Sequence, residues 1–235
     1  MVQSFGGLLF ELAFGWPLEV PPNRFADMDH AAALTAYEAE APIRVVFESG
    51  AGSATVGAPV GTYETTFAQW PLTETEATPW YLRADGTLSS ERPPADGGSS
   101  DYRFDPDAGE VTTFDGGSTG IFGNLPEYDW PVPAAGTAVL FVTPPLAADT
   151  VLLGPASADL WVESTEDDTD IEVTVSEVRP DGTEFYVQAG WLRAGHRALD
   201  EGASTELLPV QHHIEEENEP LPDREPALLR IEIFN

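Results

Sequence analysis

The chain has 235 residues, 42% of them hydrophobic and none of them cysteine, so it can bury a sizeable core but cannot form disulfides or thiolate metal sites. Its formal net charge of −31 argues against binding to nucleic-acid phosphates and to anionic membrane surfaces. All ten basic residues are arginine, which fits either a GC-rich genome or adaptation to high salt. Compartment and oligomeric state do not follow from these numbers.

The first 41 residues are predicted to hold two short helices. Residues 3–16 form an apolar stretch that stops at Pro17, and Asp27 or Asp29 is expected to cap the second helix, HAAALTAYEAE. Glu11 interrupts the apolar stretch and no positive charge precedes it, which argues against a signal peptide.

The rest of the chain, residues 42–235, is typical of short strands joined by turns. The 21 glycines and 21 prolines favour this pattern over long helices. Pro180-Asp181-Gly182 separates EVTVSEVR from EFYVQAGW and predicts a hairpin. Trp161 and Trp191 are expected to anchor the core between two sheets. Strands are predicted at 43–48, 62–67, 78–83, 101–104, 137–142, 150–153, 157–163, 170–179, 183–192 and 227–234.

The last predicted strand alternates apolar and polar residues, ALLRIEIFN, with no turn after it. An unpartnered strand exposes backbone hydrogen-bonding groups and promotes aggregation. We therefore expect the chain to be a piece of a larger protein, prone to associate through residues 227–234 and 3–16.

A series of segments then resembles one known family, in order and at sensible spacing. The segments are WYLRADGTLS, YRFDP, the Gly-Gly pair, VLFVTPPLAADTVLLGPASADLWVES, DTD, VSEVRPDG and GWLRAGHRAL. Together they resemble the C-terminal β-sandwich of the cocaine-esterase-like (CocE/NonD) hydrolases, a domain shared with X-Pro dipeptidyl-peptidases of the S15 type.

The resemblance implies a mainly β fold. Residues 42–235 would form an incomplete jelly-roll, or galactose-binding-like, β-sandwich that is truncated at its C-terminal end. Residues 1–41 would be a helical connector from an α/β-hydrolase domain. That missing domain would carry the Ser-Asp-His triad upstream of residue 1, so no catalytic residue and no cofactor are expected in this chain. The implied partners are this hydrolase domain and a small ester or amide substrate, with no nucleic acid and no membrane.

The resemblance also implies a substrate-pocket role for Ile121 and Phe122. In this family the loop after the DP element and the Gly-Gly pair places apolar side chains against the acyl group of the substrate. Ile121 and Phe122 would form a passive wall that supplies shape to the pocket and makes no bonds. The alternative is that Phe122 is a core residue.

Gly116-Gly117-Ser118-Thr119-Gly120 matches the G-x-S-x-G pattern of a serine nucleophile. That chemistry needs a strand before the serine and a helix after it, whereas IFGNLPEYDWPVP contains three prolines and no helical period. A loop between strands is the favoured interpretation. If Ser118 were a nucleophile, one of Asp167, Asp168 and Asp170 and then His196 would follow it in the order Ser, Asp, His, although order alone is weak evidence in so acidic a chain.

The remaining polar candidates are expected to be structural. His30 is interpreted as part of a surface helix, and His212-His213 as a solvated loop, because adjacent side chains on an extended loop point apart and cannot easily share one metal ion. Asp167, Asp168 and Asp170 do not have the spacing of a calcium loop, so a solvated turn is favoured. Arg193, His196 and Arg197 are expected to pair with acidic groups.

Three functions follow in order of support. The first is the C-terminal portion of a serine hydrolase that acts on acyl ester or amide bonds. The second is a stand-alone β-sandwich that binds carbohydrate or protein without catalysis, which would need a row of aromatic residues on one exposed sheet face. The third is a self-sufficient esterase that uses Ser118.

Overall fold

The computed structural model describes residues 7–12, 22–48, 60–105, 133 and 136–233. The chain forms two compact units, each treated by itself below. One unit comprises Met1–Glu74 and Tyr102–Ala138, and the other comprises Thr75–Asp101 and Val139–Asn235. The boundary predicted at residue 42 stays a prediction.

The described part of the first unit contains both predicted helices and one β-hairpin. Residues 7–12 are helical, and α2 spans His30–Glu38. Asp29 caps α2 as predicted, because its carboxylate accepts the backbone N–H of Ala32 at 2.9 Å. Strand β1 (Ile43–Phe47) pairs antiparallel with β2 (Tyr63–Phe67), so both strand predictions are confirmed.

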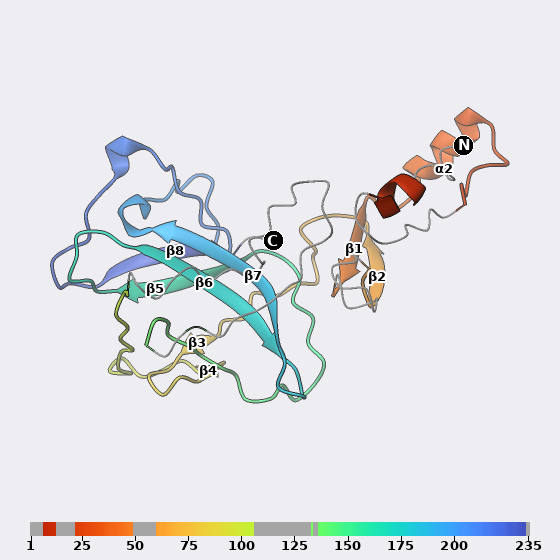
Figure 1. Cartoon of the computed structure of the whole chain (residues 1–235). Coiled ribbons are helices and arrows are strands. Elements are labelled where there is room, and N and C mark those ends of the chain that lie inside the picture. The colour runs from red at the N-terminus through yellow and green to blue at the C-terminus, as the bar shows by residue number, and fades with distance from the viewer. Residues whose placement is uncertain (1–6, 13–21, 49–59, 106–132, 134–135, 234–235) are drawn as a thin grey trace. The chain divides into compact units, whose positions relative to one another are not determined.

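Within its described residues, the second unit holds three antiparallel strand pairs (Figure 1). Strand β6 pairs with β7, β5 pairs with β8, and the short β3 pairs with β4. A 3-10 turn, η2, follows β7, and a second, η3, precedes β8. The bounds are β3 Tyr81–Leu82, β4 Leu88–Ser89, β5 Ala156–Val162, β6 Asp170–Val178, β7 Glu184–Arg193, η2 Ala194–His196, η3 Glu215–Glu217 and β8 Ala227–Ile233.

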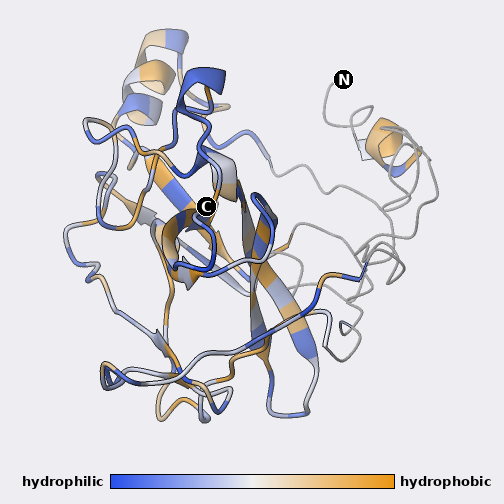
Figure 2. Cartoon of the chain, turned by 90° about the vertical axis from the view of Figure 1, so that its left-hand side faces the viewer, coloured by the Kyte–Doolittle hydropathy of each residue, from blue (hydrophilic) through white to orange (hydrophobic). Residues whose placement is uncertain are grey.

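The core lies between the β5–β8 pair and the β6–β7 pair. Strand β8 buries every second residue, and Leu229 and Ile231 are fully buried. They pack with Ile171 of β6 and Leu192 of β7, while apolar residues of β5 lie against the same cluster. The colouring along the strands shows the corresponding alternation of hydrophobic and hydrophilic residues (Figure 2). Two sheet layers around one core confirm the mainly β fold class.

Two hairpins of this unit use the same five-residue turn. Arg83–Thr87 reads R-A-D-G-T and Arg179–Thr183 reads R-P-D-G-T. In the second, Gly182 N–H donates to the Arg179 carbonyl at 2.9 Å, and Thr183 N–H donates to the Asp181 carboxylate at 2.9 Å. Gly182 has a φ of 85°, which a glycine adopts without strain. The hairpin predicted at Pro180-Asp181-Gly182 is therefore confirmed.

Several predictions about strands were wrong. Residues 101–104 and 150–153 are not strands, and the strand predicted at 137–142 reduces to a single bridge between Val142 and Thr87. Their apolar side chains find little cover among the described residues: Phe104 is 79% exposed and Leu152 is 69% exposed. Strand β4 was not predicted, because two residues are too few to show a period.

Trp161 and Trp191 were expected in the core and are not there. Trp161 is 71% exposed and Trp191 is 54% exposed. Each stands next to an inward-facing residue on its strand, Leu160 on β5 and Leu192 on β7. Because side chains alternate between the faces of a strand, both tryptophans point outward.

Gly190 sits where the backbones of β7 and β8 approach each other closely. A Cβ atom at Gly190 would lie 1.8 Å from the carbonyl oxygen of Glu232 and 3.3 Å from Cα of Ile233. Backbone atoms cannot move aside as a flexible side chain can, so any larger residue has to push the two strands apart. The tight packing of the core therefore depends on this glycine.

We predict that Gly190→Ala lowers the free energy of unfolding by about 1–3 kcal/mol or more, as overpacked cores do. Gly202→Ala is the matched control, because a Cβ there meets only the Asp200 carboxylate at 3.3 Å. Denaturant unfolding of both variants measures the difference. Equal stability of Gly190→Ala and the parent chain would contradict the close approach.

Candidate functional site

The residues predicted to contact substrate cannot be placed. Ile121 and Phe122 lie outside the described residues, and so does Ser118. The two arguments that depend on them, the acyl-pocket wall and the alternative nucleophile, stay predictions. The described residues do place the acids, histidines and tryptophans that the sequence singled out.

Asp168 fastens the start of β6 to the turn after β7. Its carboxylate accepts the Arg193 side chain at 2.6 Å and the Gly195 and Thr169 backbone N–H groups at 2.8 and 3.0 Å. Burial disfavours the charged carboxylate, but these hydrogen bonds outweigh it and hold the pKa of Asp168 below its ordinary value. Asp168 was predicted to lie in a solvated turn, and it is instead half-buried and bonded.

The basic residues near η2 are paired with acidic and carbonyl groups, as predicted for Arg193 and Arg197. The Arg197 guanidinium donates to the Glu219 carbonyl at 2.6 Å and lies 3.2 Å from the Glu219 carboxylate. The His196 ring lies 5.9 Å from that of His213, centroid to centroid. The described hydrogen bonds of Asp168 go to Arg193, Gly195 and Thr169, so they do not form the Asp–His pair that a nucleophilic Ser118 would use.

His212 joins two acidic segments of the loop before β8. Its Nδ1 lies 2.5 Å from the Glu217 carboxylate, and its Nε2 lies 3.4 Å from Asp200. The hydrogen bond with Glu217 is the largest cause that raises the pKa of His212 above its ordinary 6.5. His30, by contrast, is exposed at the first position of α2, which agrees with the predicted surface helix.

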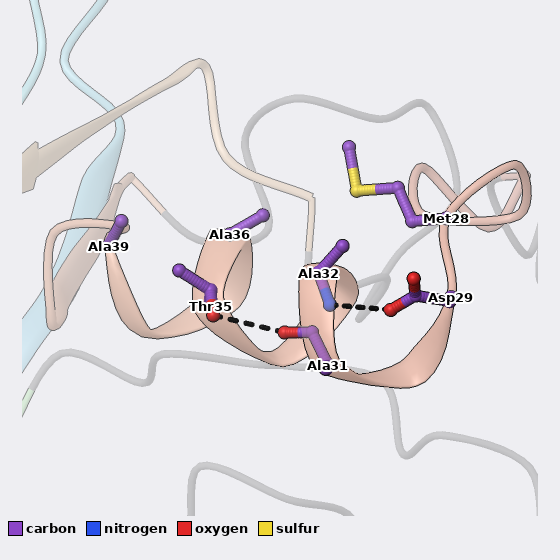
Figure 3. Close-up of a pocket in the computed structure, with 7 residues that line it drawn as sticks. All are labelled: Met28, Asp29, Ala31, Ala32, Thr35, Ala36 and Ala39. Atoms are coloured by element: carbon purple, nitrogen blue, oxygen red, sulfur yellow. Dashed lines mark hydrogen bonds between the residues drawn. The ribbon is translucent and has the colours of Figure 1, made fainter.

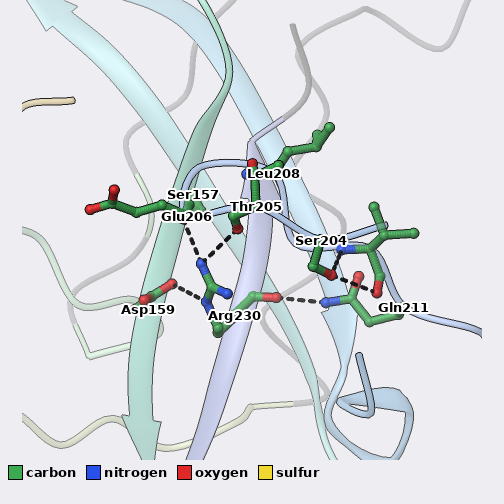
Figure 4. Close-up of polar contacts among 9 residues, drawn as sticks. Ser157, Asp159, Ser204, Thr205, Glu206, Leu208, Gln211 and Arg230 are labelled. Atoms are coloured by element: carbon green, nitrogen blue, oxygen red, sulfur yellow. Dashed lines mark hydrogen bonds and ion pairs between the residues drawn. The ribbon is translucent and has the colours of Figure 1, made fainter. Parts of the chain in front are cut away.

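Arg230 is a structural centre that the sequence analysis missed. Its side chain points outward from β8 and donates to Asp159 of β5 at 3.2 Å and to the backbone carbonyls of Thr205 and Glu206 at 3.3 and 2.5 Å (Figure 4). The Arg230 carbonyl accepts the Gln211 amide at 2.7 Å. These bonds hold the loop 204–211 over one end of the β5–β8 pair. The partners lie 19 to 71 positions from Arg230 in sequence, so spacing could not reveal them.

The outer sides of the two strand pairs differ in character. Trp161 stands opposite Leu228 on the β5–β8 pair, and Leu228 is 36% exposed, so two apolar residues adjoin. Trp191 stands opposite the exposed Glu172 on the β6–β7 pair. Because both pairs turn their other sides to the shared core, Trp161 and Trp191 face opposite directions.

A hollow lies along α2 in the first unit. It is lined by small residues of one helix face, with Met28 at its edge (Figure 3). The described residues of α2 include no buried one, although Leu34 and Tyr37 are large and 45% and 61% exposed. Short helices of this kind are marginal in water without a packing partner.

Within the described ranges, no group of three or more acidic, histidine or cysteine side chains is placed to hold a metal ion. A helix long and apolar enough to cross a bilayer is likewise absent from the part of the chain that was described.

The contacts of His212 with Glu217 and Asp200 predict that the stability of the fold depends on pH. A histidine whose pKa is higher in the folded state adds stability below its unfolded pKa, and this stability is lost as the pH rises through the folded pKa. We expect His212→Gln to lower the melting temperature at about pH 5.5, where the ring is charged, and to change it little at about pH 8.5. Thermal unfolding at both pH values measures this, with His30→Gln as a control for loss of an exposed histidine. An equal effect at both values would contradict the ion pair.

This chain is similar to one family of protein domains and to two proteins named as serine esterases. Residues 21–235 match the family model of the X-Pro dipeptidyl-peptidase C-terminal non-catalytic domain. The chain is 31% identical over 134 residues to "Putative serine esterase Mb1866c" of Mycobacterium bovis and "Putative serine esterase MT1883" of Mycobacterium tuberculosis. The matches cover 57% of this chain and 21% of each relative, so the chain spans about a fifth of their length.

A solved structure shares the fold. The crystal structure of a CocE/NonD family hydrolase from Staphylococcus aureus matches 73% of this chain and 28% of its own, with a TM-score of 0.50 and 22% identity. The family model covers nearly the whole chain, and the resemblance seen in the sequence is confirmed. The chain belongs to the family of X-Pro dipeptidyl-peptidase C-terminal non-catalytic domains.

Proposed function

We propose that this chain is the C-terminal β-sandwich portion of a serine hydrolase that cleaves acyl ester or amide bonds through an acyl-enzyme. The observation that carries the proposal is the match of residues 21–235 to a non-catalytic domain of a peptidase family. The Mycobacterium relatives, which are named as serine esterases, support the reaction class. The catalytic serine, aspartate and histidine would lie in an α/β-hydrolase domain of the same polypeptide.

In this proposal the chain has two roles. Ile121 and Phe122 would line the acyl pocket as an apolar wall, which selects substrates by shape. The sandwich would hold that loop in place and provide an interface for the hydrolase domain. The polar groups at the end of the sandwich fit a supporting role, since Asp168 and Arg197 are already engaged in bonds that hold loops together.

The exposed tryptophans reopen the alternative of a carbohydrate-binding module. Such a module needs aromatic rings in a row on one sheet face, and Trp161 and Trp191 lie on sheets whose outer sides face opposite directions. The hydrolase proposal therefore has the stronger support.

The location of the nucleophile can be tested on the chain as it is. We expect a fluorophosphonate probe followed by peptide mass spectrometry to label no serine, because the nucleophile would lie in another domain. Ser118→Ala is the control for the G-x-S-x-G motif. A label on Ser118 that this variant abolishes would overturn the proposal and make the chain an esterase by itself.

The pocket role predicts selectivity for the acyl group. In the hydrolase that carries this chain, Phe122→Ala should lower kcat/KM for esters of bulky acids by about 10- to 100-fold and change acetate esters much less, because shape contacts in an apolar pocket are worth that much. Phe104→Ala, at a phenylalanine that is 79% exposed, is the matched control. Equal losses for both acyl groups would contradict the wall.

A further inference from the structure

The outer side of the β5–β8 pair is divided into a covered half and an open half. We call it the β5–β8 outer face, made by the alternate residues that point away from the core: Ser157, Asp159, Trp161, Leu228, Arg230 and Glu232. The loop 204–206 lies over one half. It is tied there by Arg230, which is only 19% exposed, and by the Ser157 hydroxyl, which donates to the Glu206 carbonyl at 3.4 Å.

The open half presents an apolar pair where a free surface is expected to be polar. Trp161 and Leu228 are direct partners in the strand register, so their side chains adjoin on the same face. Trp161 keeps 71% of its surface exposed, the largest exposed fraction of any described tryptophan. Large aromatic residues on such patches are characteristic anchors of interfaces, because they bury much area with few rotatable bonds.

The surroundings of the pair determine what can cover it. Just beyond it on the same ends of the strands lie the exposed carboxylates Glu163, Asp223 and Glu225, with one exposed cation, Arg224, between the last two. A second copy of this chain would bring a further formal charge of −31 against them. A partner with an apolar pocket and a neutral or basic rim fits instead.

We propose that Trp161 and Leu228 form the surface on which the catalytic domain of the same polypeptide docks. The proposal rests on the proposed function, in which that domain exists. It is supported by the share of the Mycobacterium relatives that this chain leaves unmatched, since the matching segment is 21% of their length. A domain held next to the sandwich by the chain itself meets this patch at high effective concentration, so a small apolar anchor suffices.

The absence of cysteine makes a direct test possible. Leu228→Cys introduces one thiol into the chain, and Glu172→Cys introduces one on the opposite outer side as a matched control. Each variant is made in the 235-residue chain and in the hydrolase that carries it, and each is treated with N-ethylmaleimide. Peptide mass spectrometry follows the labelling rate at the introduced thiol.

We expect the labelling rate of the Leu228→Cys thiol to be lower in the hydrolase than in the chain alone, by about tenfold or by a larger factor. The reason is that a covered side chain reacts only through local opening. The thiol of Glu172→Cys should react at similar rates in both. Equal rates at position 228 would overturn the docking surface, as would protection at position 172 alone. Protection at position 228 in the chain alone, with dimers in sedimentation velocity, would identify a second copy as the occupant and also overturn it.

A second readout separates this inference from the proposed function. Fluorophosphonate labelling of the hydrolase reports whether a catalytic serine is present. A labelled serine with an unprotected thiol at position 228 refutes only the docking surface. No labelled serine in the whole protein refutes the proposed function, and the docking surface with it. Trp161→Ser should also make the hydrolase melt at a lower temperature than Trp191→Ser does, and equal melting temperatures would count against docking at Trp161.

Discussion

The approach of two backbones at Gly190 is the constraint on which the rest of the sandwich depends. Burial of apolar surface has no direction, so it can draw two sheets together but cannot set how they lie. The missing side chain of Gly190 lets β7 approach the carbonyl of Glu232, and this closeness leaves Leu229 and Ile231 with no exposed surface. Once the inner residues are fixed, the period of two along each strand determines which residues face outward. The exposure of Trp161 is thus a consequence of the core and not an accident of the surface.

Local chemistry made part of the fold predictable, and long-range pairing limited the rest. The turn at Asp181-Gly182 and the cap at Asp29 are determined by a few neighbouring residues, so they could be predicted from the sequence. The segment 150–153 has the composition of a strand but no strand partner among the described residues, and composition cannot supply one. The size of the Trp161 side chain favours a core position, but the alternation of residues along β5 decides its direction. Leu160 and Val162 are apolar neighbours on both sides, and their inward position requires Trp161 to point out.

Three arginines of this acidic chain fasten its loops to the sandwich. Arg230 holds the loop 204–206, Arg197 holds the segment at Glu219, and Arg193 joins β7 to Asp168. A guanidinium is suited to this work because it offers several donors in one plane, so one side chain can bind carbonyls and a carboxylate together. The pairing of Arg193 and Arg197 with acidic groups was predicted, but the particular partners of the three arginines could not be, since each bond joins residues far apart in the chain. They also explain why the acids near them are poor candidates for catalysis: the carboxylate of Asp168 is already committed to Arg193 and to two backbone groups.

These features bear on how a domain without catalytic chemistry can affect a reaction. An apolar wall discriminates between substrates only if it keeps its position, and position is provided by packing and by bonds behind the wall. In this chain, bonded loops lie against a tightly packed sandwich, and one half of its β5–β8 outer face has no cover among the residues that the structure describes. A supporting domain needs both a tightly packed core and an open docking surface, since a packed core alone does not place a pocket wall relative to a nucleophile in another domain. The bonded half and the uncovered half lie on the same two strands, β5 and β8, so a partner bound at Trp161 and Leu228 would be held directly beside the strands that Arg230 and Asp159 join.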